Sequence, residues 1–240
     1  RYENYDIASD HTIGIYVDHG TYPSWRDEEF DVIFHMAALA RIQPSLENPA
    51  SHIKNNFNST LHILELARKK EIPVVYAGSS SFWGGVYKNP YTFSKWQGEE
   101  LVKLYHQIYE LPTIVCRFYN VYGPKQLVDG PYCTVVGVFM NQYEEKQDIT
   151  ITWDGEQRRD FTHVYDIVSG LILSGEKLVD RDVNGQFFEL GSGENYSINQ
   201  LADAFGEHPK VKIPKRPGEM RETLCTDTLA NELLGWEPKE

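Results

Sequence analysis

Short apolar runs alternate with longer amphipathic segments along the first half of the chain. Apolar runs at residues 31–38, 73–78 and 113–118 each have the length and composition of one buried strand. Between them, residues 50–70 and 91–109 repeat apolar side chains at helical spacing. This alternation predicts the α/β class, with a parallel sheet covered by helices.

The pattern loosens after Gly123 and Pro124. It then predicts helices at 135–145, 164–178 and 227–234, strands at 149–153 and 187–190, and a helix through Phe205 with Ser197 as its N-cap. We place a soft boundary near residue 125 and expect later segments to interleave with the sheet. The predicted domains are therefore 1–125 and 126–240.

Composition narrows the possible partners. The 240 residues include 35 acidic and 23 basic side chains, for a net charge of −12, whereas a nucleic-acid surface needs the opposite balance. No apolar run approaches the ~20 residues of a membrane span, so neither nucleic acid nor membrane is an expected partner. The three cysteines form no CxxC and fit a reducing cytoplasm. The eight histidines form no HxH or HExxH, and we predict no metal.

Candidate chemistry begins with Tyr91 and Lys95, which stand four residues apart on the predicted helix and so share one face. A neighbouring cation favours phenolate, so Lys95 is expected to lower the pKa of Tyr91 toward that of a general acid/base. The spacing alone is weak in a chain with 15 tyrosines. Ser79 adds weight because it follows a predicted strand, and parallel sheets bind ligands beyond the carboxyl ends of their strands. We expect Ser79 and Tyr91 to face one cleft.

These residues also carry a family resemblance. The Ser79–Gly84 segment followed by Tyr91 and Lys95 resembles the extended short-chain dehydrogenases/reductases of the NAD-dependent epimerase/dehydratase family, particularly the UDP-galactose 4-epimerases. Six further ordered segments share the likeness: 34–38, 55–60, 117–124, 157–166, 216–219 and 234–238.

The resemblance implies a Rossmann-like, doubly wound parallel sheet with a smaller C-terminal substrate-binding lobe. It implies an NAD-dependent epimerase that acts on a nucleotide-diphosphate sugar through a transient keto intermediate, and it leaves a homodimer as an open expectation. Residues 1–125 would form an N-terminally incomplete NAD-binding domain, and residues 126–240 mainly the substrate lobe.

The resemblance also assigns roles to matching residues. The implied catalytic residues are Ser79, Tyr91 and Lys95. The implied cofactor contacts are Tyr91 and Lys95 together with Asp18, Met36, Ala37, Ala38, Asn55 and Tyr119. The implied substrate contacts are Ser79, Asn120, Arg159 and Arg216, the arginines because guanidinium forks suit diphosphate oxygens. Surface ion pairing is the alternative reading of the two arginines.

Two features depart from the family pattern. No glycine-rich GxxGxxG turn precedes Asp18, so we expect a missing N-terminal segment and weak or undetectable NAD binding by the 240-residue form. The stretch from Gly84 to Tyr91 is also shorter than in relatives, which leaves the sugar specificity open.

Several functions remain as alternatives. Dehydratase relatives carry an Asp-Glu pair directly after the hydroxyl residue, whereas this chain has Ser80 and Ser81, which disfavours a 4,6-dehydratase. A reductase or decarboxylase of the same fold is the enzymatic alternative. A non-catalytic nucleotide-sugar-binding protein is the other, although it does not account for Ser79, Tyr91 and Lys95 together.

Overall fold

The computed structural model describes residues 30–178 and 183–240. Its main sheet has four strands in the order β1-β2-β3-β7, and every pairing in it is parallel. The strands are β1 (Ile33–His35), β2 (Val74–Ser79), β3 (Thr113–Phe118) and β7 (Phe187–Leu190). The α/β class and the parallel sheet are thus confirmed.

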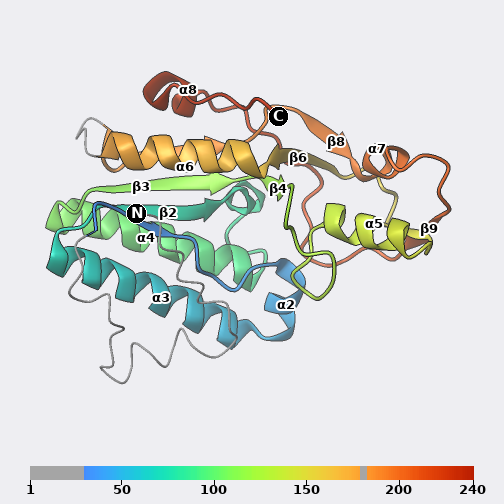
Figure 1. Ribbon diagram of the computed structural model, residues 1–240. Coiled ribbons are helices and arrows are strands. Elements are labelled where there is room, and N and C mark those ends of the chain that lie inside the picture. Colours follow the sequence, from blue (N-terminus) through green and yellow to red (C-terminus); the bar gives the residue numbers. More distant parts are fainter. Residues whose placement is uncertain (1–29, 179–182) are drawn as a thin grey trace.

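Helices cover both faces of this sheet (Figure 1). Helices α3 (Pro49–Lys70) and α4 (Pro90–Tyr109) lie on one face, and α6 (Val164–Leu178) and α8 (Leu229–Leu234) lie on the other. Successive side chains of β2 point to opposite faces of the sheet. Val74 and Tyr76 pack in the core under α3 and α4, and Val75 packs in the core under α6. Burial on both faces explains why these strands are almost continuously apolar.

The start of α4 places the candidate chemistry. Pro90 is its first residue, which suits a position that has no intrahelical N–H partner. Asn89 caps the helix, and its side-chain oxygen accepts a hydrogen bond of 2.8 Å from the Thr92 amide. Tyr91 therefore lies in the first turn of a well-defined helix, beside the carboxyl end of β2.

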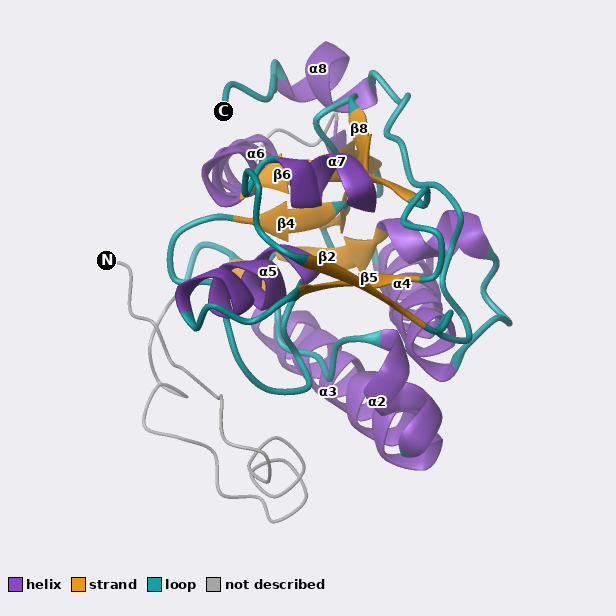
Figure 2. Ribbon diagram, turned by 90° about the vertical axis from the view of Figure 1, so that its right-hand side faces the viewer, coloured by secondary structure: helices purple, strands orange, loops and turns teal. Residues whose placement is uncertain are grey.

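The second half of the chain forms a smaller lobe around two further sheets (Figure 2). Strands β4 (Asn120–Tyr122), β6 (Arg158–His163) and β8 (Asn195–Ser197) form one, and β5 (Ile149–Thr152) pairs with β9 (Lys210–Ile213) in the other. Helices α5 (Val135–Glu144) and α7 (Ile198–Asp203) close over a core that includes Phe139, Ile149 and Ile198.

Most predicted elements are confirmed, and β3, α6 and β7 have the predicted bounds. Ser197 caps α7 as predicted, in a capping box with Gln200. The sequence interpretation missed α2 (Ile42–Glu47), the 3₁₀ helix η2 (Ser80–Gly84), β4, β6, β8 and β9. β7 belongs to the first sheet although it follows residue 125, and the exact division at that residue stays a prediction.

Within residues 30–178 and 183–240, no helix combines the length and the apolar character needed to cross a membrane.

Burial of His35 predicts a pH-dependent stability. The ring lies 3.1 Å from the Thr60 hydroxyl, and burial, aided by the charge of Lys95, lowers the pKa of His35 to about 3. An unfolded histidine has a pKa near ~6.5, so the unfolded chain gains a proton below that pH and the folded chain does not. This stabilisation is present above about pH 6.5 and is lost as the pH falls toward 3.

Urea unfolding at pH 7 and pH 5 tests this. The parent protein should lose about 2 kcal/mol more unfolding free energy over this interval than His35→Gln. Equal losses in the two proteins would contradict a neutral, buried His35.

Candidate active site

Ser79 and Tyr91 meet at the carboxyl edge of the main sheet. The Tyr91 hydroxyl donates a hydrogen bond of 3.4 Å to Ser79 Oγ. Ser79 ends β2 and caps η2, where its Oγ accepts the Ser81 amide at 3.3 Å and shares a 2.9 Å hydrogen bond with the Ser81 hydroxyl. The strand end and the first helical turn thus bring together two hydroxyls that are 12 positions apart in the sequence.

Lys95 lies one helical turn after Tyr91 and is only 5% exposed. Its ammonium lies over the Tyr76 ring, 4.3 Å from the centroid, and has no hydrogen-bond acceptor among the described residues. Gly98 makes this arrangement possible, since a Cβ there would lie 2.1 Å from the Tyr76 hydroxyl. Burial lowers the pKa of Lys95 to about 8, which leaves a weakly held proton on a buried amine.

The expected lowering of the Tyr91 pKa by Lys95 is wrong for this structure. Burial of the phenol raises its pKa, and the Ser79 hydrogen bond opposes this only in part. The positive charge that acts on Tyr91 is that of Arg41, because the Lys95 ammonium lies over Tyr76 instead. In this arrangement the neutral phenol is the favoured form.

Arg41 is a neighbour that the sequence interpretation missed. It has a left-handed backbone (φ 76°), and its Nε donates a 2.8 Å hydrogen bond to the Tyr132 carbonyl. Burial lowers the pKa of Arg41, and within the described residues no carboxylate pairs with it. An arginine without an acidic partner beside Tyr91 is suited to an acidic group on a ligand.

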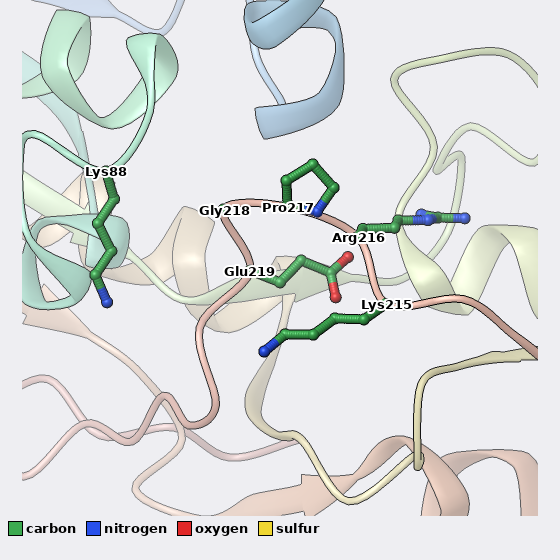
Figure 3. Close-up of a pocket in the computed structure, with 6 residues that line it drawn as sticks. All are labelled: Lys88, Lys215, Arg216, Pro217, Gly218 and Glu219. Atoms are coloured by element: carbon green, nitrogen blue, oxygen red, sulfur yellow. The ribbon is translucent and has the colours of Figure 1, made fainter.

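The predicted substrate arginines lie on two segments of the smaller lobe. Arg159, in β6, donates a 2.8 Å hydrogen bond to the Arg158 carbonyl, and burial lowers its pKa while the charge of Glu219 opposes this. Arg216 is exposed on a segment that lines a pocket of about 510 Å³, whose lining residues are Lys88, Lys215, Arg216, Pro217, Gly218 and Glu219. Figure 3 shows the Arg216 guanidinium extending away from Lys88 and Lys215. Glu219 thus links the two arginines: its charge acts on Arg159, and it lines the same pocket as Arg216.

Asn120 of β4 links β6 to the segment that follows Arg216 through its side-chain hydrogen bonds. Its side-chain amide donates to the Asp160 carbonyl at 3.0 Å and to the Thr223 hydroxyl at 3.2 Å. These bonds join β4, β6 and the segment that follows Arg216. The substrate contact predicted for Asn120 stays a prediction, and the remaining side-chain acceptor is the atom that could make it.

Comparison with known proteins identifies the family of this chain. The family model "NAD dependent epimerase/dehydratase family" matches residues 23–191. This chain belongs to that family. It is 33% identical to the UDP-glucuronate 4-epimerase of Thermodesulfobacterium geofontis, over 86% of this chain and 67% of the relative. It is 30% identical to the UDP-N-acetyl-alpha-D-glucosaminuronate decarboxylase of Bacillus cytotoxicus, over 80% of this chain and 64% of the relative.

Among solved structures, the UDP-glucuronic acid 4-epimerase of Bacillus cereus in complex with UDP-glucuronic acid and NAD superposes with a TM-score of 0.80. It is 25% identical, and the match covers 88% of this chain and 71% of that chain. The extended short-chain dehydrogenase/reductase assignment and the Rossmann-like fold are therefore confirmed.

Asn56 holds the segment after β1 in place beside the candidate site. Asn56 is 2% exposed, and its side chain accepts the Leu39 amide at 2.7 Å and donates to the Leu39 carbonyl at 3.0 Å and to Ser94 Oγ at 2.9 Å. It thereby fixes the segment after β1 against α4. The predicted Asn55 instead donates within its own helix, to Ser51 Oγ at 3.0 Å. The cofactor contact that the sequence interpretation assigned to Asn55 stays a prediction.

For the other predicted cofactor residues the structure gives the position and the exposure, and their contacts with a cofactor stay predictions. Met36 is exposed and Ala37 and Ala38 are half-buried just beyond β1, and Tyr119 is buried after β3. Asp18 lies outside the described residues. The residues present fit a nicotinamide nucleotide, because the buried Lys95 ammonium still has hydrogen-bond donors to offer to ribose hydroxyls.

In the described part of the chain, no group of three or more His, Cys, Asp and Glu side chains is placed to hold a metal ion.

Proposed function

We propose that this protein is an NAD-dependent epimerase of nucleotide-diphosphate sugars, and that it inverts C4 of a UDP-linked sugar as its named relatives do. The observation that carries the proposal is the 3.4 Å contact between the Tyr91 hydroxyl and Ser79 Oγ at the carboxyl edge of the parallel sheet. Open α/β sheets bind their ligands at this edge.

The proposed roles follow from the chemistry of oxidising and re-forming an alcohol. The chemistry that bound NAD would supply is hydride transfer from the sugar carbon and back to the opposite face of the keto sugar. Tyr91 accepts the proton of the sugar hydroxyl in its phenolate form, the minor form in this arrangement, as that carbon is oxidised. The resulting phenol gives the proton back as the new hydroxyl forms. Ser79 hydrogen-bonds the same sugar oxygen, and Lys95 holds a ribose hydroxyl and supplies positive charge.

Arg159 and Arg216 are proposed to bind the diphosphate. Asn120 is proposed to accept a hydrogen bond from a donor group of the nucleotide sugar, since its Nδ2 already donates within the protein. Arg159 is half-buried with Glu219 as its charged neighbour, and Arg216 lines the pocket on the same segment as Glu219. Guanidinium groups on these two segments can contact a diphosphate that spans them.

Calorimetric titration of UDP, UDP-glucose and UDP-glucuronate tests the arginine roles. Arg159→Ala and Arg216→Ala should each weaken binding by roughly 10–100-fold, the loss of one charge-assisted hydrogen bond of ~1.5–3 kcal/mol. Arg68→Ala is the matched control, because Arg68 pairs with Glu65 on the surface of α3. Unchanged affinity in both site variants, for a ligand that the parent binds, would rule out the assigned diphosphate site.

A decarboxylase of a nucleotide-linked uronic acid is the second candidate. It is favoured by the similarity to the Bacillus cytotoxicus decarboxylase and by Arg41, which could bind a sugar carboxylate near Tyr91. Product analysis separates the two activities. An epimerase returns a nucleotide-linked uronic acid of unchanged mass, whereas a decarboxylase releases carbon dioxide and leaves a nucleotide-linked pentose.

A further inference from the structure

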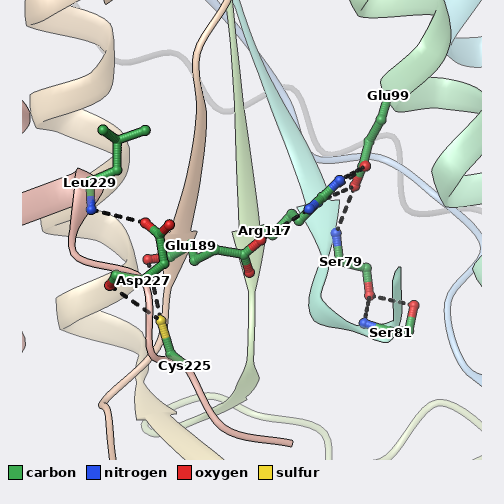
Figure 4. Close-up of polar contacts among 8 residues, drawn as sticks. All are labelled: Ser79, Ser81, Glu99, Arg117, Glu189, Cys225, Asp227 and Leu229. Carbon is green, nitrogen blue, oxygen red and sulfur yellow. Dashed lines mark hydrogen bonds and ion pairs between the residues drawn. The ribbon is translucent and has the colours of Figure 1, made fainter. Parts of the chain in front are cut away.

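Glu99 extends the Tyr91–Lys95 face of α4 by one further turn. The three residues are spaced by four positions, so their side chains follow one another along one side of the helix. Glu99 is 1% exposed. One of its carboxylate oxygens accepts the backbone amide of Ser79 at 3.4 Å, so the carboxylate contacts the turn that presents the Ser79 hydroxyl (Figure 4).

Arg117 of β3 holds this carboxylate from the other side. Its Nη2 donates to Glu99 Oε2 at 2.7 Å, and its Nε lies 3.2 and 3.1 Å from the two oxygens. Its Nη1 donates to Glu189 of β7 at 3.1 Å. Burial raises the pKa of Glu99, but the forked contact with Arg117 opposes this and is that of an ionised carboxylate.

The cluster is packed tightly against the Ser79 turn. A Cβ at Gly78 would lie 2.8 Å from Glu99 Oε1 and 2.8 Å from Arg117 Cγ, so only glycine lets β2 pass there. The Arg117 guanidinium also stacks on Phe82 of η2, 3.8 Å from the ring centroid. The ion pair and the turn therefore pack directly against each other.

Glu99 also acts on Lys95. Among the charged and titratable groups that face Lys95, His35 of β1 is neutral, Tyr76 of β2 is a neutral phenol, and Glu99 is the carboxylate whose charge favours the ammonium. Arg117 lies on the far side of that carboxylate and is itself balanced by Glu189. Glu99 is therefore the anion that supports a positive charge on Lys95 among the described groups.

We propose that Glu99 is a positioning residue of this active site, which fixes the Ser79 turn against Tyr91 and keeps the Lys95 ammonium charged. The catalytic part of this inference rests on the proposed function. The charge part does not, because it concerns only the protonation of Lys95.

Glu99→Gln tests both parts, since it keeps an acceptor for the Ser79 amide and removes the charge. Loss of the Glu99 charge should lower the pKa of Lys95 from about 8. As the pH is raised, the variant should therefore lose activity at a lower pH than the parent does. We expect the high-pH limb of kcat to move down by about one pH unit, with KM for the nucleotide sugar little changed and activity partly restored at lower pH. A purely structural defect would not be restored by pH.

Two control variants separate the effect of the Glu99 charge from other effects of substitution. Glu100→Gln changes the adjacent, exposed residue of α4 and should leave the profile unchanged. Glu99→Asp retains the charge and should keep the high-pH limb of the parent even if kcat falls. A shifted limb in Glu99→Asp, or an unshifted one in folded Glu99→Gln, would overturn the proposal.

An activity-independent measurement separates this inference from the epimerase assignment. NMR titration of isotopically methylated lysines should show Lys95 with a pKa near 8 in the parent and a lower value in Glu99→Gln. Lys95→Arg identifies the signal by its absence. A Lys95 pKa unchanged by Glu99→Gln would refute the charge role even in a protein that proved to be no epimerase.

Discussion

Replacement of Tyr91 by phenylalanine should reduce turnover by roughly 10²–10⁴-fold while nucleotide-sugar affinity stays nearly unchanged. The substitution removes only the hydroxyl that contacts Ser79 Oγ at 3.4 Å. That hydroxyl carries the proton in the proposed reaction, whereas the ring fills its place in either variant. Steady-state kcat and calorimetric affinity for the same UDP-sugar measure the two effects separately.

Tyr87→Phe is the matched control, because Tyr87 precedes α4 in the same region and is 81% exposed. It should retain both turnover and affinity. Full activity in Tyr91→Phe would exclude Tyr91 as the acid/base. Equal loss of affinity and turnover in Tyr91→Phe would mean that the hydroxyl binds substrate and does not transfer the proton.

The second large effect is expected at Asp160, whose fully buried carboxylate joins three segments of the smaller lobe. It accepts the backbone amides of Ser192, Gly193 and Cys225 at 2.8, 3.1 and 3.0 Å, and also the hydroxyls of Ser192 and Thr162. Asp160→Ala would leave three backbone amides without this acceptor, each at a cost of about 1–3 kcal/mol. We expect the melting temperature to fall by on the order of 10 °C.

The same substitution should weaken nucleotide-sugar binding, because Asp160 follows Arg159 in β6 and holds the segment that leads back to Arg216. Asp154→Ala is the control: Asp154 pairs with Arg221 at the surface, and its loss should leave melting and binding close to those of the parent. A melting temperature for Asp160→Ala equal to that of the Asp154 control would contradict the network.

The sequence predicted best those elements whose burial follows their apolar pattern. β3 is buried almost throughout and nearly all apolar, so its bounds could be read directly. β6 could not be recognised in the same way, because the residues that it buries are Asp160 and Thr162. Their burial depends on hydrogen bonds to distant segments, which a hydrophobic pattern does not contain. α2 is only one to two turns long and includes Pro44, so it too lacks a periodic signal.

In the candidate site, too, some residues could be predicted from the sequence pattern, and others depend on contacts between distant segments. The pairing of Ser79 with Tyr91 followed from strand and helix order, and the structure brings them together. Glu99 had an available signal, since it repeats the spacing that singled out Lys95, but its role depends on Arg117 from another strand. Arg41 had no signal in the sequence, because its position beside Tyr91 depends on a left-handed backbone conformation at that single residue.

Proton NMR of UDP-glucuronate, UDP-glucose and UDP-N-acetylglucosamine incubated in D2O with the protein and NAD tests the C4-epimerase proposal directly. We expect at least one of these sugars to be converted to its C4 epimer. The hydrogen on the inverted carbon should come from the sugar, since hydride leaves and returns without exchange with solvent. Deuterium at the inverted carbon, or tight binding of a UDP-sugar and NAD with no epimer of any of the three, would contradict the proposal.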